Sequence, residues 1–132
     1  MAERILVCDD EAHILYAVSF KLSTAGFEIA QANNGQEAIE WLESNTPDFV
    51  ITDYQMPFVD GFELCRFLRS RPQTATVPII MLTAKALELS EDEVKAELGL
   101  ETILMKPFSP RGLLETVRKT LAARTPAAAV AS

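Results

Sequence analysis

The stretch Ile5-Leu6-Val7-Cys8-Asp9-Asp10 decides the fold of this chain. It is a short apolar run that ends directly in two carboxylates. Three further short apolar runs follow it, and each is followed directly by a polar or charged residue. They are Phe49-Val50-Ile51-Thr52 before Asp53, Ile79-Ile80-Met81-Leu82 before Thr83, and Ile103-Leu104-Met105 before Lys106. Unbroken apolar runs of this length are typical of strands buried in a parallel sheet.

Helical patterns separate the apolar runs, and this alternation predicts an α/β fold with a doubly wound parallel sheet. A further strand is predicted over residues 27–32, where apolar and polar residues alternate as they do in half-buried edge strands. Gly26 and Gly99 are placed to end the first and fourth helices. Helix starts are marked by characteristic pairs, namely Asn34 with Glu37, Asp60 with Glu63, Ser90 with Glu93, and Ser109 with Pro110.

Length and composition indicate one domain. The 132 residues are 48% hydrophobic and 23% charged, which is ordinary for a folded domain with a full core. We expect this domain to span residues 1–124, and the alanine-rich residues 125–132 to form a flexible tail or the stump of a linker. The net charge of −7 argues against direct binding to nucleic acid or to an anionic membrane, since both require a basic face.

Targeting signals and metal-binding cysteine patterns are missing from the sequence. No stretch approaches the ~20 apolar residues of a membrane-spanning helix, and the first residues do not resemble a signal peptide. We therefore expect no membrane insertion and a cytoplasmic location. Cys8 and Cys65 are expected to be buried, reduced thiols, and with a single histidine they form no recognisable zinc pattern.

The polar residues at the ends of the apolar runs are the candidate site. In an open parallel sheet ligands bind at the carboxyl ends of the strands, so Asp9, Asp10, Asp53, Thr83 and Lys106 are expected to converge there. Each alone has an ordinary explanation, such as helix capping for the acidic pair. Together the carboxylates would repel one another unless a divalent cation joined them, and such oxygen ligands suit Mg²⁺. A hydroxyl and an amine beside the metal are suited to phosphoryl transfer.

At this point the chain resembles the receiver domain of two-component response regulators, over essentially residues 3–123. The resemblance rests on four stretches in the same order and at the same separations, which are residues 5–11 (ILVCDDE), 53–61 (DYQMPFVDG), 82–84 (LTA) and 106–108 (KPF). It implies a flavodoxin-like (βα)5 sheet with strand order 2-1-3-4-5. It also implies a bacterial signalling switch that catalyses only its own phosphorylation and dephosphorylation.

The resemblance implies a role for each site residue. Asp53 would be the phosphoacceptor, and the ligands of Mg²⁺ or Mn²⁺ would be Asp9, Asp10, Asp53 and the backbone carbonyl of Gln55. The phosphoryl group would be bound by Thr83, Ala84 and Lys106. The peptide bond before Pro107 would be cis, as is usual in such proteins.

Three positions concern regulation. Ile103 stands where the family usually carries a tyrosine or phenylalanine that turns inward on phosphorylation. This is either a tolerated core substitution or a sign that the signal leaves the site by another route. Gln55 and Lys85 match positions that flank the path of the attacking water, and they would tune the lifetime of the phosphoryl group.

The implied donor is a sensor histidine kinase or a histidine phosphotransfer protein. The surface of helix four, strand five and helix five would then control an unknown protein partner, either from a stand-alone receiver or from the receiver of a longer protein. Alternatives are a receiver that is never phosphorylated, an aspartyl-nucleophile phosphatase and a flavodoxin-like electron carrier. The phosphatase would typically carry a second Asp where Gln55 stands, and Asp9-Asp10 would repel a flavin phosphate.

Overall fold

The computed structural model describes residues 2–84 and 91–131. Parallel strands form one sheet in the order β2-β1-β3-β4-β5, which confirms the predicted fold class and strand order. The strands are β1 (Arg4–Cys8), β2 (Glu28–Ala32), β3 (Phe49–Asp53), β4 (Ile79–Thr83) and β5 (Thr102–Met105). The helices are α1 (Ala12–Thr24), α2 (Gly35–Leu42), α3 (Gly61–Ser70), α4 (Glu91–Leu98) and α5 (Pro110–Ala131).

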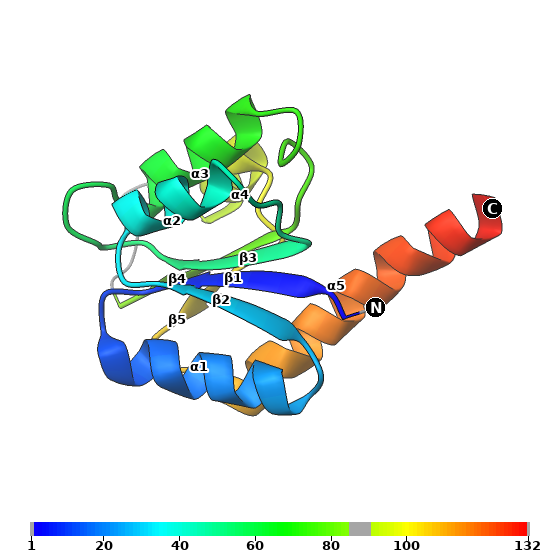
Figure 1. The fold of residues 1–132 in the computed structure, drawn as a ribbon, viewed down its shortest axis with the longest axis horizontal. Coiled ribbons are helices and arrows are strands. Elements are labelled where there is room, and N and C mark those ends of the chain that lie inside the picture. Colours follow the sequence, from blue (N-terminus) through cyan, green and yellow to red (C-terminus); the bar gives the residue numbers. More distant parts are fainter. Residues whose placement is uncertain (1, 85–90, 132) are drawn as a thin grey trace.

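Helices cover both faces of the sheet. One face packs against α1 and α5, and the other packs against α2, α3 and α4 (Figure 1). Strands β3 and β4 bury every residue, and β1 buries all but its first, which explains their unbroken apolar runs. Strand β2 lies at the edge and is only partly buried, as its alternating pattern predicted.

The helix ends agree with the sequence wherever the structure describes them. Capping side chains accept main-chain hydrogen bonds at three helix starts, from Glu37 to Asn34 (2.8 Å), from Glu63 to Asp60 (2.9 Å) and from Gly112 to Ser109 (3.1 Å). Gly26 follows α1 and Gly99 follows α4, both with positive φ. Ser90, predicted to cap α4, lies outside the described residues.

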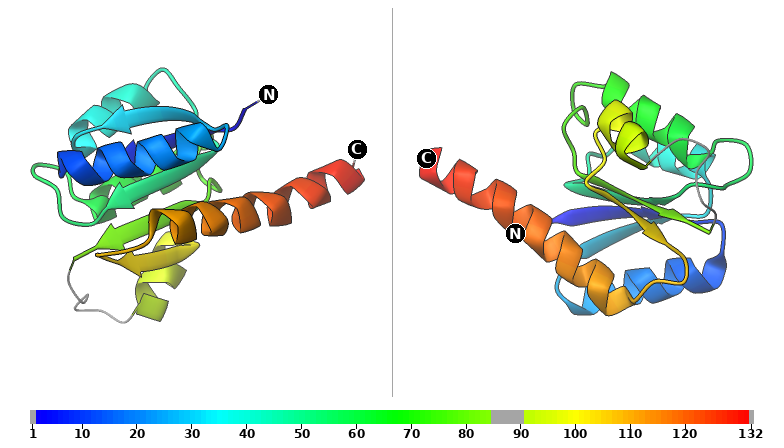
Figure 2. Two further views of the ribbon diagram at one scale, coloured as in Figure 1. Left: turned by 90° about the horizontal axis from the view of Figure 1, so that it is seen from below. Right: turned by 180° about the vertical axis from the view of Figure 1, so that it is seen from behind.

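Helix α5 extends past the body of the domain, and its second half stands clear of the sheet in Figure 2. The helix runs through Ala131, and the tail or linker stump expected over residues 125–132 stays a prediction. Alanine has the highest helix propensity, so an alanine-rich segment readily prolongs an existing helix. The domain boundary at residue 124 stays a prediction. No helix among the described residues is both long and apolar enough to cross a membrane.

Both cysteines are buried and free, as predicted. Burial raises the pKa of each thiol to about 12, so both are protonated at neutral pH. The Cys8 thiol lies 3.3 Å from the sulfur of Met56, which ties the end of β1 to the loop after β3. Cys8 therefore belongs to the packing beneath the candidate site.

Candidate functional site

Strand register brings the predicted site residues to one edge of the sheet. Cys8 in β1 pairs with Thr52 in β3, so that Asp9 and Asp53 follow at the same level. Asp53 pairs with Leu82 in β4, one residue before Thr83, and Thr83 pairs with Met105 in β5, one residue before Lys106. The carboxyl ends of all four strands therefore meet, on the left of Figure 1. Asp9, Asp53 and Thr83 are buried there, whereas Asp10 is exposed.

Lys106 lies at the centre of this edge. Its ammonium nitrogen is 2.7 Å from Oε1 of Glu11, 3.1 Å from Oδ2 of Asp9 and 3.3 Å from Oδ1 of Asp53. The Lys106 main-chain N–H donates to the carbonyl of Thr83 (2.8 Å), and the bond from Lys106 to Pro107 is cis, as predicted. One cation is thus shared by three carboxylates.

The loop between β3 and α3 packs beside Asp53. A Cβ atom at Gly61 would lie 2.5 Å from the carbonyl oxygen of Asp53, so only glycine allows α3 to begin this close to β3. The main-chain N–H of Tyr54 donates to the carbonyl of Leu82 at 2.7 Å, and that of Gly61 donates to Tyr54 at 2.8 Å. These contacts fix Asp53 between β1 and β4.

Burial and mutual repulsion set the charges of the site. Removal from water, followed by the charge of Asp9, raises the pKa of Asp53 to about 7, although Lys106 acts in the opposite direction. Burial likewise raises the pKa of Asp9. Burial alone would lower the pKa of Lys106, but Glu11 and Asp9 outweigh it and raise that pKa. Within the described residues, the site therefore carries more negative charge than Lys106 balances.

The same residues fit a hard divalent cation. Asp9, Asp10, Glu11 and Asp53 each offer a carboxylate oxygen, and these oxygens lie within 4.8 Å of one another. Oδ2 of Asp9 is buried, and its described partner is the Lys106 ammonium at 3.1 Å, a contact that lacks the geometry of a hydrogen bond. A buried oxygen of this kind is satisfied by a cation, and an all-oxygen donor set favours Mg²⁺ or Mn²⁺ over softer metals.

An open cleft of about 420 Å³ leads to these acids. It is lined by Asp10, Tyr54, Gln55, Met56 and Asp60, so it lies between the end of β1 and the β3–α3 loop. A cleft of this volume can take a small ligand beside Asp10.

The remaining predicted residues have mixed outcomes. Ala84 is exposed directly after β4, and the side chain of Gln55 is exposed beside the cleft. Ile103 is buried and belongs to the core cluster under α2, α3 and α4. Lys85 lies outside the described residues. Sequence reasoning assigned no role to Glu11, although it directly follows the acidic pair and carries the third carboxylate of that stretch.

Phe58, in the β3–α3 loop, has an unusual main-chain conformation. Its φ of 70° lies in the left-handed region, and 88% of its surface is exposed. Such a conformation is rare for a bulky residue, because Cβ approaches the main chain too closely. No sequence pattern in the loop signalled this strained aromatic residue.

Known proteins share this fold and this arrangement. The model of the family described as response regulator receiver domain matches residues 5–118. The alkaline phosphatase synthesis transcriptional regulatory protein PhoP of Bacillus subtilis is 37% identical over 121 residues, covering 92% of this chain and 49% of that protein. The phosphate regulon transcriptional regulatory protein PhoB of Rhizobium meliloti is 39% identical over 121 residues, covering 92% and 53%. The chain spans about half the length of these curated relatives.

Solved structures agree. The chemotaxis response regulator CheY4 of Vibrio cholerae superposes with a TM-score of 0.81 at 32% identity, over 90% of this chain and 98% of that one. The receiver domain of the sensor histidine kinase PA1611 from Pseudomonas aeruginosa superposes with a TM-score of 0.78 at 26% identity, over 90% and 97%. That structure is described as having a magnesium ion coordinated in its active-site cleft.

Proposed function

The chain belongs to the family of response regulator receiver domains, which act in two-component signalling, and from this we propose that it is a switch phosphorylated on Asp53. The observation that carries the proposal is the position of Lys106, with its ammonium 3.3 Å from a buried Asp53 carboxylate. A cation in this position can bind a phosphoryl group on Asp53 without leaving its place.

The proposed chemistry is transfer of a phosphoryl group from a histidine nitrogen to a carboxylate oxygen. The Asp53 oxygen forms a bond to phosphorus while the phosphorus–nitrogen bond breaks, and the imidazole leaves with the electron pair and takes up a proton. Lys106 offsets charge on the phosphoryl oxygens, and the Thr83 hydroxyl and the Ala84 main chain bind them. Water then attacks phosphorus, releases inorganic phosphate and restores the Asp53 carboxylate.

We propose that Mg²⁺ or Mn²⁺ is held by Asp9, Asp10, Asp53 and the backbone carbonyl of Gln55. The bound ion would neutralise charge on the phosphoryl oxygens during transfer. Two observations support this assignment, namely the cluster of carboxylate oxygens around the buried Asp9 and the magnesium in the cleft of the PA1611 receiver. Gln55 and Lys85 remain proposed tuning residues for the lifetime of the phosphoryl group.

The proposed donor is a sensor histidine kinase or a histidine phosphotransfer protein, and the proposed output is a protein partner bound by the surface of α4, β5 and α5. PhoP and PhoB are named as transcriptional regulators, but we propose no direct nucleic-acid binding by this acidic receiver chain. We also propose a cytoplasmic location, because a kinase obtains its phosphoryl group from ATP in that compartment.

Ile103 concerns how phosphorylation of Asp53 would change the partner-binding surface of α4, β5 and α5. A buried isoleucine has no aromatic ring to turn inward when Thr83 moves toward the phosphoryl group. We propose that the signal passes through α4 and its flanking loops without that ring. Replacement by tyrosine (Ile103→Tyr) is then expected to change affinity for the partner without abolishing phosphorylation, and unchanged affinity would contradict this.

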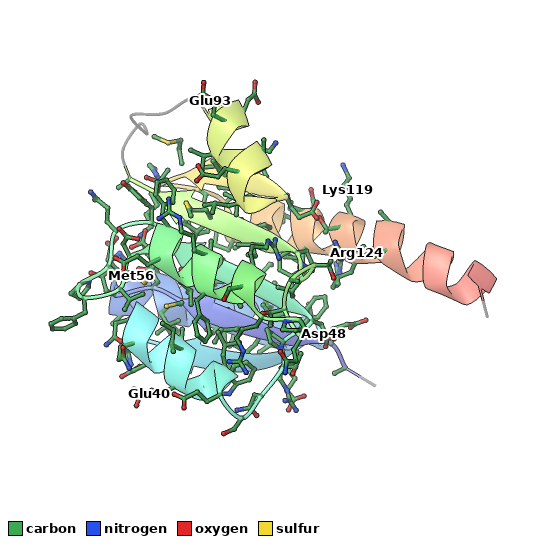
Figure 3. All side chains as sticks on the ribbon, turned by 90° about the horizontal axis from the view of Figure 1, so that it is seen from above. Glu40, Asp48, Met56, Glu93, Lys119 and Arg124 are labelled. Atoms are coloured by element: carbon green, nitrogen blue, oxygen red, sulfur yellow. The ribbon has the colours of Figure 1, made fainter. Side chains whose placement is uncertain are left out.

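Intact-protein mass spectrometry after incubation with acetyl phosphate tests the phosphoacceptor. We expect one added phosphoryl group in the presence of Mg²⁺, no addition with chelator, and none in Asp53→Asn. Asp48→Asn is the matched control, because Asp48 lies at the opposite end of the sheet from the Met56 loop (Figure 3) and accepts a main-chain hydrogen bond that asparagine can also accept. The control should gain the group as the wild type does.

The opposite result identifies the second candidate, a receiver that binds partners without being phosphorylated. The isoleucine at position 103 is the observation that favours it. Failure of the wild type to gain mass, together with failure to bind beryllofluoride as a phosphoryl mimic, would establish this alternative and reject the switch.

A further inference from the structure

The nearest partner of the Lys106 ammonium is Glu11, which the receiver chemistry does not use. Oε1 of Glu11 lies 2.7 Å from Nζ, closer than the oxygens of Asp9 and Asp53, and it accepts a hydrogen bond from Nζ. The ion pair is strong enough for Lys106 to hold the pKa of Glu11 below its usual range. In the unphosphorylated site, the shortest contact of the Lys106 ammonium is therefore with the partly exposed carboxylate of Glu11.

The main chain holds Glu11 in place for this contact. Glu11 is the N-cap residue of α1, and its carbonyl accepts hydrogen bonds from Ile14 (3.1 Å) and Leu15 (3.0 Å). Its side chain makes no capping hydrogen bond, so the carboxylate can reach toward Lys106 instead. Removing that carboxylate would leave the helix start intact.

The two ends of the ion pair differ in burial. The side chain of Lys106 is 8% exposed, whereas that of Glu11 is 44% exposed. An ammonium has three N–H donors, and the three surrounding carboxylates can occupy all of them. A phosphoryl group on Asp53 would add strong acceptor oxygens beside Lys106, so one existing partner must give way. Asp53 carries the phosphoryl group itself and Asp9 is buried at the proposed metal site, which leaves the partly exposed Glu11 as the partner to be displaced.

We propose that Glu11 is a positioning residue that holds the Lys106 ammonium in the unphosphorylated protein and competes for it with the phosphoryl group. This inference rests on the proposed phosphorylation of Asp53. Because displacement of Glu11 opposes the phosphorylated state, Glu11 lowers the affinity of the site for a phosphoryl group and shortens its lifetime. Glu11 is therefore a counter-ion of Lys106 and does not act as a metal ligand.

The experiment measures binding of beryllofluoride at saturating Mg²⁺ by isothermal titration, together with the rate of dephosphorylation after acetyl phosphate treatment. Glu11→Gln should bind beryllofluoride about three- to tenfold more tightly and lose its phosphoryl group more slowly by a similar factor. Glu11→Asp keeps the charge but shortens the side chain, and it should behave like Glu11→Gln. Glu40→Gln, on the outer part of α2 (Figure 3), is the matched control and should equal the wild type.

A double-mutant cycle separates the ion pair from the general negative field of the site. In a Lys106→Met background, Glu11→Gln should no longer change the affinity for beryllofluoride, since no ammonium remains for which Glu11 and the phosphoryl mimic compete. Persistence of the effect in that background, or a Glu11→Asp variant equal to the wild type, would show that charge alone acts and would overturn the proposal.

Other outcomes also decide the matter. A fall of about tenfold or more in Mg²⁺ affinity for Glu11→Gln would make Glu11 a metal ligand and reject the counter-ion role. Equal beryllofluoride affinity in Glu11→Gln and the wild type would reject the inference alone. If wild type and the Glu40→Gln control both fail to bind beryllofluoride and to gain a phosphoryl group, the proposed function fails and the inference falls with it.

Discussion

The carboxyl ends and the amino ends of the strands differ in charge and in backbone conformation. We call these two sides of the domain the carboxyl edge and the amino edge. At the carboxyl ends of the strands, the carboxylates of Asp9, Glu11 and Asp53 share the ammonium of Lys106. At the amino edge, the Arg69 guanidinium donates to the main-chain carbonyls of Leu98, Gly99, Thr74 and Ala75, at 2.8 to 3.2 Å. The first edge leaves polar groups for a ligand to satisfy, and the second satisfies its own.

Backbone conformation follows the same division. Among residues 2–84 and 91–131, the left-handed positions at the amino ends of the strands are the glycines Gly26 and Gly99, whereas the one at the carboxyl ends is Phe58. Glycine adopts positive φ without strain, but phenylalanine does not. Figure 3 separates the two edges, with Met56 in the loop of Phe58 at one end and Asp48 and Arg124 at the other. Strain and unmet charge therefore gather where function is proposed, as expected of sites prepared for a ligand.

The largest loss of stability that we predict is at the amino ends of the strands. Arg69→Met keeps most of the aliphatic stem but removes every donor, so carbonyls at the end of α4 and before β4 lose their partner. We expect the free energy of unfolding to fall by about 2 kcal/mol. The measurement is urea denaturation, with acetyl phosphate phosphorylation as a second reading that should not change.

Arg66→Met is the control for this prediction. Arg66 lies three residues earlier on α3, and it makes a more exposed ion pair with Glu97 at 3.6 Å. Arg66→Met should lower the free energy of unfolding by less than about 0.5 kcal/mol. Equal losses in the two variants would show that the Arg69 hydrogen bonds add nothing beyond an ordinary surface charge.

At the carboxyl edge, removing a charge should raise the free energy of unfolding, whereas at the amino edge it lowers it. The pKa of Asp53 is raised to about 7 in the folded protein, mainly by burial, so the folded state binds a proton more tightly than the unfolded state does. Stability from this group is present below the ordinary aspartate pKa and is lost as the pH rises through 7. Without metal at pH 8, Asp53→Asn should therefore be more stable than the wild type, by on the order of 1–3 kcal/mol.

The pH dependence and the metal dependence provide the test. Urea denaturation in the presence of chelator should show the advantage of Asp53→Asn shrinking as the pH falls from 8 toward 5, whereas Asp48→Asn should differ from the wild type by a constant amount. Added Mg²⁺ should stabilise the wild type more than Asp53→Asn, because binding to the folded state alone adds stability. An advantage that is the same at pH 5 and pH 8 would argue against repulsion at the carboxyl edge.

The sequence alone predicted the features that come from repeating patterns or from residues close together in the chain. Apolar runs gave the strands, and local residue pairs such as Asp60 with Glu63 gave the described helix starts. The strand order and the role of each site residue came from the resemblance to receiver domains. The pairing of Lys106 with Glu11 spans 95 positions, and that of Arg69 with Gly99 spans 30. No periodic pattern carries contacts at such separations, so these pairings required the structure.

The smallest predicted effect concerns the strained loop at the carboxyl edge. In ordinary helix and strand interiors, glycine is less stable than alanine by roughly 0.5–1 kcal/mol. At a residue with φ of 70° the sign should reverse, because alanine retains the Cβ atom that makes this conformation unfavourable. Phe58→Gly should therefore exceed Phe58→Ala in free energy of unfolding by about 0.5–1 kcal/mol, as measured by urea denaturation. The ring itself is 88% exposed, so Phe58→Ala should match the wild type within about 0.5 kcal/mol. If Phe58→Gly is instead the less stable of the two, the loop is not strained, and the conformational half of the contrast between the edges is lost while the electrostatic half remains.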